Sequence, residues 1–262
     1  MKRKIIAISN QKGGVGKTTT AINLSTALAA TGQKVLIIDL DPQGNASTGL
    51  GVDYGQRENS IYEVLAGQAN ITESIRKTEI DNLFLIPSTV DLSGIEPELA
   101  DVNDRAFTLK NIFNANEKLN EFDFIFIDCP PALSLLTVMA MTTANAIIVP
   151  LQCEFFALEG LSQLIKTIER VRQNLNPGLS IDGIVLTMYD SRNKLSSQVA
   201  TDVRNHLREQ VYETIIPRNV RVSEAPSFGM PALIYDQRAS GSQAYLSLAN
   251  EVIKQNKEQE AA

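Results

Sequence analysis

The stretch Gln11-Lys12-Gly13-Gly14-Val15-Gly16-Lys17-Thr18-Thr19 decides the fold, because it joins a short apolar run to a segment rich in alanine and leucine. Glycines allow the backbone to turn several N–H groups inward, and a helix that begins directly afterwards adds a partial positive charge. This pattern predicts a phosphate-binding loop between a strand and a helix, with Lys12–Thr19 as candidate nucleotide-binding residues. We expect Lys17 to reach the β- and γ-phosphates and the Thr18 hydroxyl to bind Mg²⁺.

Apolar runs of strand length alternate with longer segments of helical period on both sides of this loop. Such alternation predicts an α/β fold with a doubly wound, mostly parallel sheet and helices on both faces. The expected strands are Ile5–Ile8, Val35–Ile38, Leu83–Ile86, Phe124–Ile127, Ala146–Val149 and Ile184–Leu186. The expected helices are Lys17–Ala30, Asp104–Leu119, Leu158–Leu175, Ser196–Gln210 and Ser242–Lys254.

Carboxylates follow two other predicted strands, at the edge of the sheet where a ligand is expected to bind. Asp39 and Asp41 end the second strand, and Asp128 ends the strand Phe124–Ile127. We expect Asp41 to orient an attacking water, whereas Asp39 supports the Mg²⁺ shell and Asp128 contacts Mg²⁺ directly or through water. An alternative for Asp39 and Asp41 is that they cap the turn that follows, which contains proline and glycine.

Composition limits the class of protein. The 262 residues contain no linker or repeat, so we expect one domain over residues 1–255 and a polar tail over 256–262. A net charge of -6 disfavours general binding to nucleic acid or anionic lipid. Two cysteines, no secretory signal and no apolar stretch of about 20 residues favour a soluble protein of the reducing cytoplasm.

The phosphate loop departs from the ordinary template, because Gln11 replaces the first glycine and a second lysine, Lys12, follows. In this respect it resembles the deviant Walker A family, whose extra lysine reaches across a dimer interface to the partner's nucleotide. The segments Asp39–Asn45, Pro150–Gly160, Leu186–Arg192 and Ile216–Pro226 are similar to those of ParA/Soj partitioning ATPases, and the likeness extends from Ile5 to about Ile253.

This resemblance implies an ATPase that uses Mg²⁺, forms a homodimer when ATP is bound and binds double-stranded DNA non-specifically on the nucleoid. A ParB-like partner would stimulate its slow hydrolysis, in which Lys12, Lys17, Asp41 and Asp128 take part. Pro217, Arg218 and Asn219 would line the adenine, and Arg192 and Arg221 would contact DNA phosphates. Charge alone gives little support for DNA, since residues 190–221 carry a net charge of only +2.

Two rival functions remain open. A MinD-like or cargo-positioning ATPase could use the apolar stripe of the last helix on a membrane, but the polar face of that helix mixes acidic and basic residues, so we expect it to pack on the domain. A metabolic P-loop enzyme or an iron-protein reductase is the second rival. Cys129 and Cys153 lack the spacing of a cluster motif and are expected to be small buried apolar residues.

Overall fold

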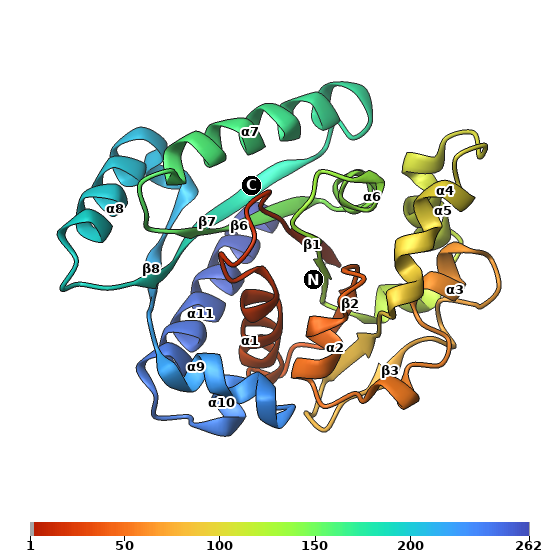
Figure 1. Ribbon diagram of the computed structural model, residues 1–262, viewed down its shortest axis with the longest axis horizontal. Coiled ribbons are helices and arrows are strands. Elements are labelled where there is room, and N and C mark those ends of the chain that lie inside the picture. Colours follow the sequence, from red (N-terminus) through yellow and green to blue (C-terminus); the bar gives the residue numbers. More distant parts are fainter. Residues whose placement is uncertain (1–2, 262) are drawn as a thin grey trace.

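An eight-stranded sheet runs through the computed structural model, which describes residues 3–261 (Figure 1). The strand order is β3-β4-β2-β5-β1-β6-β7-β8, and every neighbouring pair is parallel except β3 and β4. The strands are β1 Lys4–Ile8, β2 Val35–Asp39, β3 Arg76–Lys77, β4 Leu83–Ile86, β5 Phe124–Asp128, β6 Ala146–Gln152, β7 Ser180–Tyr189 and β8 Val211–Pro217. The doubly wound α/β fold predicted from the sequence is confirmed.

Helices cover both faces of this sheet (Figure 1). Helices α5, α6, α7 and α8 pack on one face, and α1, α9, α10 and α11 pack on the other. The helices are α1 Lys17–Ala30, α2 Asn45–Gly49, α3 Ile61–Leu65, α4 Ile95–Glu98, α5 Thr108–Asn114, α6 Leu135–Thr143, α7 Ala157–Asn174, α8 Lys194–Leu207, α9 Val220–Glu224, α10 Ala232–Tyr235 and α11 Ser240–Ala261.

The strands are apolar on both sides because each side has its own core. Along β1, Ile5 and Ala7 belong to the core under α5–α8, whereas Ile6 and Ile8 belong to the core under α1 and α11. Side chains of successive strand residues point to opposite faces, so a strand between two helix layers must be apolar at every position. This double burial fixes the sheet and leaves the loops at its edge free to carry the site.

The structure differs from the sequence prediction in several segments. The expected helix over Asp104–Leu119 is interrupted: Asp104 has φ +58°, α5 spans only Thr108–Asn114, and 3₁₀ turns flank it. The elements that were not predicted are strands β3 and β8 and helices α2, α3, α4, α6, α9 and α10. Helix α11 continues to Ala261, so residues 256–261, expected as a polar tail, form its last turns.

The apolar stripe of α11 faces the protein interior. Tyr245, Leu248, Ala249 and Val252 are at most 1% exposed and pack in the core beside α1. The expectation that this helix packs on the domain is confirmed. Among the helices of residues 3–261, none is long and apolar enough to cross a membrane.

Candidate nucleotide site

The glycine-rich loop between β1 and α1 is shaped by two left-handed glycines and one asparagine. Gly14 and Gly16 have φ +75° and +89°, values that disfavour any residue with a Cβ. The Asn10 side chain donates to the Pro150 carbonyl (2.8 Å) and accepts from the Lys12 N–H (3.0 Å). The loop is therefore fixed to the neighbouring strand β6 in the shape of a cradle.

Lys17 begins α1 and points its ammonium group back into this cradle. It is 7% exposed, and its Nζ donates to the Lys12 carbonyl at 3.1 Å. Burial lowers the pKa of Lys17, while Asp128, Cys129 and Asp41 oppose this shift. A buried cation with one hydrogen bond suits an anionic ligand that would take up its remaining donors.

A cavity of about 400 Å³ opens above the cradle. It brings together the phosphate loop and the loop after β2, which supplies Asp41. Asp41 is 7% exposed and accepts from the Gln43 N–H at 3.0 Å, so its side chain is held at the cavity wall. The lining residues are Gly13, Gly14, Gly16, Lys17, Thr18, Thr19, Asp41, Gln43, Asn45, Pro131 and Met188.

Asp128 and Asp39 lie opposite each other at the carboxyl ends of the paired strands β5 and β2, and both are fully buried. The Ser47 N–H and hydroxyl both donate to Asp39, at 2.8 and 2.7 Å. By contrast, neither carboxylate oxygen of Asp128 has a hydrogen-bond partner among the described residues. Burial raises the pKa of Asp39 to about 6, and burial together with the Asp39 charge raises the pKa of Asp128 well above its usual range.

These carboxylates fit a hard cation that is shared with a phosphate. Unpartnered buried carboxylate oxygens are costly, and Mg²⁺ takes oxygen ligands from a few side chains, water and substrate phosphates. Residues 3–261 contain no group of three or more His, Cys, Asp and Glu side chains placed to hold a metal. A cation at Asp128 would therefore depend on the Thr18 hydroxyl and on oxygens of the ligand. Asp39 is the less available of the two carboxylates because Ser47 occupies it.

Lys12 forms an ion pair with Glu154, which follows strand β6. The side chains of Lys12 and Glu154 are 46% and 35% exposed, so the pair lies at the surface. The sequence did not predict this partner for Lys12.

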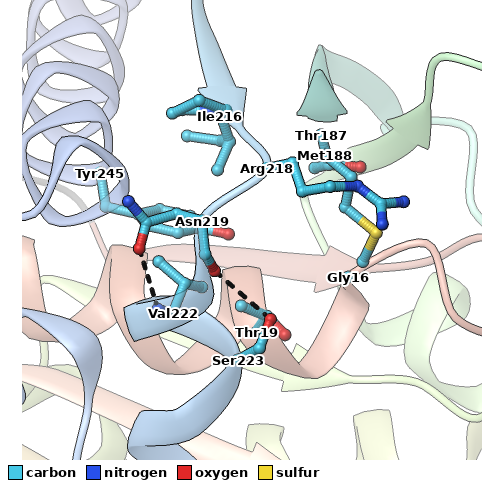
Figure 2. Close-up of a pocket in the computed structure, with 11 residues that line it drawn as sticks. Gly16, Thr19, Thr187, Met188, Ile216, Arg218, Asn219, Val222, Ser223 and Tyr245 are labelled. Atoms are coloured by element: carbon cyan, nitrogen blue, oxygen red, sulfur yellow. Dashed lines mark hydrogen bonds between the residues drawn. The ribbon is translucent and has the colours of Figure 1, made fainter. Parts of the chain in front are cut away.

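A second cavity, of about 140 Å³, continues from the phosphate loop to the loop after β8 (Figure 2). Gly16, Thr19 and Met188 line both cavities, so the two lie next to each other. The loop residues Pro217, Arg218 and Asn219, which the resemblance assigns to the adenine, line the second cavity.

Asn219 fixes the shape of this loop. Its Oδ1 accepts from the N–H groups of Arg221 and Val222, and its Nδ2 donates to the Ser240 hydroxyl at 2.9 Å. It is thus the N-cap of α9 and also ties α9 to the start of α11.

The two arginines expected to contact DNA lie after neighbouring strands, Arg192 after β7 and Arg221 in α9 after β8. Each is paired within the chain. Arg192 makes two hydrogen bonds to Asp190, both 2.9 Å long, and lowers the pKa of that carboxyl to about 2. Arg221 pairs with Glu224 at 3.1 Å and with Asp236 at 3.6 Å.

The cysteines are buried apolar residues, as expected. Cys129 and Cys153 are 1% and 5% exposed and are not in a disulfide. Burial raises the pKa of the Cys153 thiol to about 11 and also raises that of Cys129.

Sequence reasoning missed four residues that shape the site, namely Asn10, Ser47, Glu154 and Met188. Asn10 and Glu154 contact partners far away in the chain, and Met188 has an unusual backbone conformation; neither feature leaves a local pattern. Ser47 contacts Asp39, eight residues earlier, but no sequence motif marks that contact. Glu154 and Met188 do lie within the segments that are similar to ParA/Soj proteins, and this similarity is the only signal that the sequence offers for them.

Comparison with known proteins gives a consistent result. A family model described as an AAA domain matches residues 3–181. The chain is 58% identical to the chromosome partitioning protein ParA of Caulobacter vibrioides, covering 98% of this chain and 97% of that protein. It is 49% identical to the sporulation initiation inhibitor protein Soj of Bacillus subtilis, covering 95% and 98%. A crystal structure from Mycobacterium smegmatis, titled cobyrinic acid a,c-diamide synthase with bound ADP and magnesium, has a TM-score of 0.85 and 35% identity and covers 97% and 96%.

Proposed function

The chain belongs to the ParA/Soj family of partitioning ATPases, and we propose that it is a switch that binds DNA as an ATP-bound dimer and releases it after hydrolysis. One observation carries this proposal above the others. The loops after β1 and β2 bring Lys17 and Asp41 to one cavity, and the charge of Asp128, buried at the end of the neighbouring strand β5, acts on Lys17. An apolar pocket in a suitable position for a base shares Gly16, Thr19 and Met188 with that cavity.

ATP and Mg²⁺ are the ligands of this site. The amides of Gly13–Thr19 and the Lys17 ammonium would hold the phosphates, and the pocket at Pro217–Asn219 would hold the adenine. Solved relatives contain ADP or an ATP analogue with magnesium. Thr18 and Asp128 would hold the metal, with Asp39 acting on it through Asp128.

Hydrolysis depends on positioning and charge rather than on covalent chemistry. We assign Asp41 the role of orienting the attacking water, because it is fixed at the cavity wall opposite the phosphate loop. Lys17 neutralises charge that develops on the phosphates. Bound Mg²⁺ supplies further neutralisation of that charge. Turnover is expected to be slow until a ParB-like partner completes the site.

Dimerisation would be driven by Lys12. In the single chain Lys12 pairs with Glu154 at the surface, so it must leave this pair to reach the nucleotide of a second copy. A surface ion pair of this kind contributes only about 0–1 kcal/mol, so little free energy opposes the exchange.

DNA binding would use Arg192 and Arg221, which lie after adjacent strands. Their carboxylate partners Asp190, Glu224 and Asp236 weaken each arginine as a phosphate ligand in a single copy. A dimer presents two such sets, and the summed charge can hold a duplex that one set cannot.

Gel filtration of the Asp41→Ala protein, with ATP and with or without duplex DNA, tests this function. Because the variant should bind ATP but not hydrolyse it, we expect a stable dimer that elutes with DNA. With ADP the same protein should elute as a monomer without DNA. If the protein remains a monomer in saturating ATP, the proposed ATP-dependent dimerisation is wrong. If it forms a dimer that does not elute with DNA, the proposed DNA binding is wrong.

A further inference from the structure

Strand β7 breaks its alternation of side chains near its end, beside the phosphate loop. Ile184 and Leu186 belong to the core under α5–α8, whereas Val185 belongs to the opposite core. Alternation would therefore direct Thr187 towards α1 and Met188 back towards α7 and α8. Instead, Thr187 and Met188 both line the nucleotide cavity (Figure 2).

The cause is an irregular backbone at Met188. This residue has φ +50°, a left-handed conformation that is strained for a residue other than glycine. The pairing of β7 with β8 also shifts register here, since Leu186 pairs with Ile215 but Tyr189 pairs with Pro217. Three steps on β7 thus match two on β8, which is a β-bulge. After the bulge, Tyr189 returns to the α8 side, where its hydroxyl lies 3.0 Å from that of Ser197.

The bulge places Met188 at the junction of the two cavities. Its terminal methyl lies 3.8 Å from the position that a Cβ on Gly16 would occupy, and Met188 lines both the base pocket and the phosphate cavity. Thr187 takes a different role, because its hydroxyl donates to the Val15 carbonyl at 2.8 Å and holds the loop. Met188 is partly exposed, and no core packing explains its conformation.

We propose that Met188 is a nucleotide-contacting residue whose thioether packs against the sugar of bound ATP or ADP, and that the bulge in β7 serves to aim it there. The position between the base and phosphate cavities is where the sugar of a bound nucleotide must pass. A flexible, polarisable side chain suits a partly apolar surface of this kind. This inference rests on the proposed nucleotide site and adds a residue to it.

The test is calorimetry with ATP, ADP and inorganic triphosphate on the full chain and on Met188→Gly. Glycine relieves the left-handed strain and removes the thioether. We therefore expect the melting temperature of Met188→Gly to decrease no more than that of the control variant Asn82→Gly, described below. The affinities for ATP and ADP should fall on the order of tenfold, the effect of removing one apolar side chain from the sugar, whereas that for triphosphate should not change. Met188→Leu should restore most of the nucleotide affinity.

Asn82→Gly is the matched control, because Asn82 also has a positive φ (+64°) and lies in the turn before β4, away from both cavities. Equal ATP affinity in the wild-type and Met188→Gly proteins would overturn the proposal. So would a parallel decrease in affinity for triphosphate, since that would indicate damage to the loop. If the wild-type protein binds triphosphate but neither ATP nor ADP, the nucleotide site itself is wrong and Met188 has no sugar to contact.

Discussion

At the scale of single residues, the buried carboxyl pair of Asp39 and Asp128 dominates the site. Burial raises the pKa of both carboxyls, and a neighbouring carboxylate raises each further: Asp41 acts on Asp39, and Asp39 acts on Asp128. Burying these carboxylates in the ionised form costs free energy, and a cation bound at Asp128 would offset part of this cost. Binding sites commonly carry such a cost, because charged groups that the function requires can lower the stability of the fold.

This pair predicts a pH dependence of stability. Asp39 has a pKa of about 6 in the folded protein, against an ordinary value of 3.8. Between these values the folded state holds more protons than the unfolded state, so stability should fall as pH rises from about 4 to about 6. Asp39→Asn should have a smaller slope over this range, because only the contribution of Asp128, whose pKa is also raised, remains. Melting curves of both proteins without nucleotide test the prediction, and parallel curves over that range would contradict it.

Substitution of Lys12 should affect ATP-dependent dimerisation but hardly change the stability of the folded protein. Lys12→Ala removes a half-exposed ion pair, so the free energy of unfolding should change by only about 0–1 kcal/mol. The affinity for ADP should be retained, but ATP should no longer produce dimers in light scattering. Glu154→Gln should act in the opposite direction, giving dimers at lower protein concentration because Lys12 is released. Persistent dimers in Lys12→Ala would refute the role across the interface.

At the scale of elements, the loops that follow parallel strands carry the site, and the sequence predicted most of them. The expected strands lie within β1, β2, β4, β5, β6 and β7 because doubly buried strands are continuous apolar runs, although β6 and β7 extend well beyond the predicted bounds. The sequence did not reveal β8 because its residues mix buried and exposed side chains without a clean period. The helix expected over Asp104–Leu119 is shortened to α5 by 3₁₀ turns on both sides, which composition does not reveal.

The site was predicted where a local pattern exists and missed where distant elements meet. Lys17, Asp41 and Asp128 stand in short motifs next to strands, and the structure brings them together. The Lys12–Glu154 pair joins residues 142 positions apart. The direction of the Met188 side chain depends on a bulge in β7, where that strand pairs with β8. Neither can be read from neighbours in the sequence.

Asn219 both caps α9 and lines the base pocket, so its substitution should affect stability and nucleotide binding together. Asn219→Ala removes the cap of α9 and should cost about 1 kcal/mol of stability. It should also weaken ATP binding, because the loop lines the base pocket. Asn193→Ala is the matched control, since Asn193 caps α8 through the Leu195 N–H at 3.0 Å and does not line that pocket. If both variants lower stability equally and leave ATP affinity unchanged, the loop does not contact the base.

At the scale of the whole molecule, the proposed function requires a protein of net negative charge to bind DNA, which is also negatively charged. Such binding requires a local basic surface. The chain carries -6 overall, but residues 190–221 carry +2, which leaves -8 on the rest. Repulsion from the acidic remainder would keep a single copy off DNA and would make binding depend on the dimer.

This arrangement predicts the behaviour of a double arginine variant. Arg192→Ala with Arg221→Ala should weaken binding of the ATP-bound dimer to duplexes of unrelated sequence by similar factors. The slope of log affinity against log salt should fall by about 0.9 for each DNA phosphate that the variant no longer neutralises. Arg172→Ala, which removes a surface pair with Glu169 on α7, should leave both the affinity and the slope unchanged. An unaltered slope in the double variant would place the DNA surface elsewhere.

All of these roles depend on a nucleotide held between the phosphate loop, Asp128 and the loop before α9. The most direct measurement is titration calorimetry of ATP into the wild-type protein, once with Mg²⁺ and once with the metal chelated. We predict saturable binding that weakens strongly on chelation and is abolished in Lys17→Ala. Absence of any Mg²⁺-dependent uptake of ATP by the pure, folded protein would contradict the account.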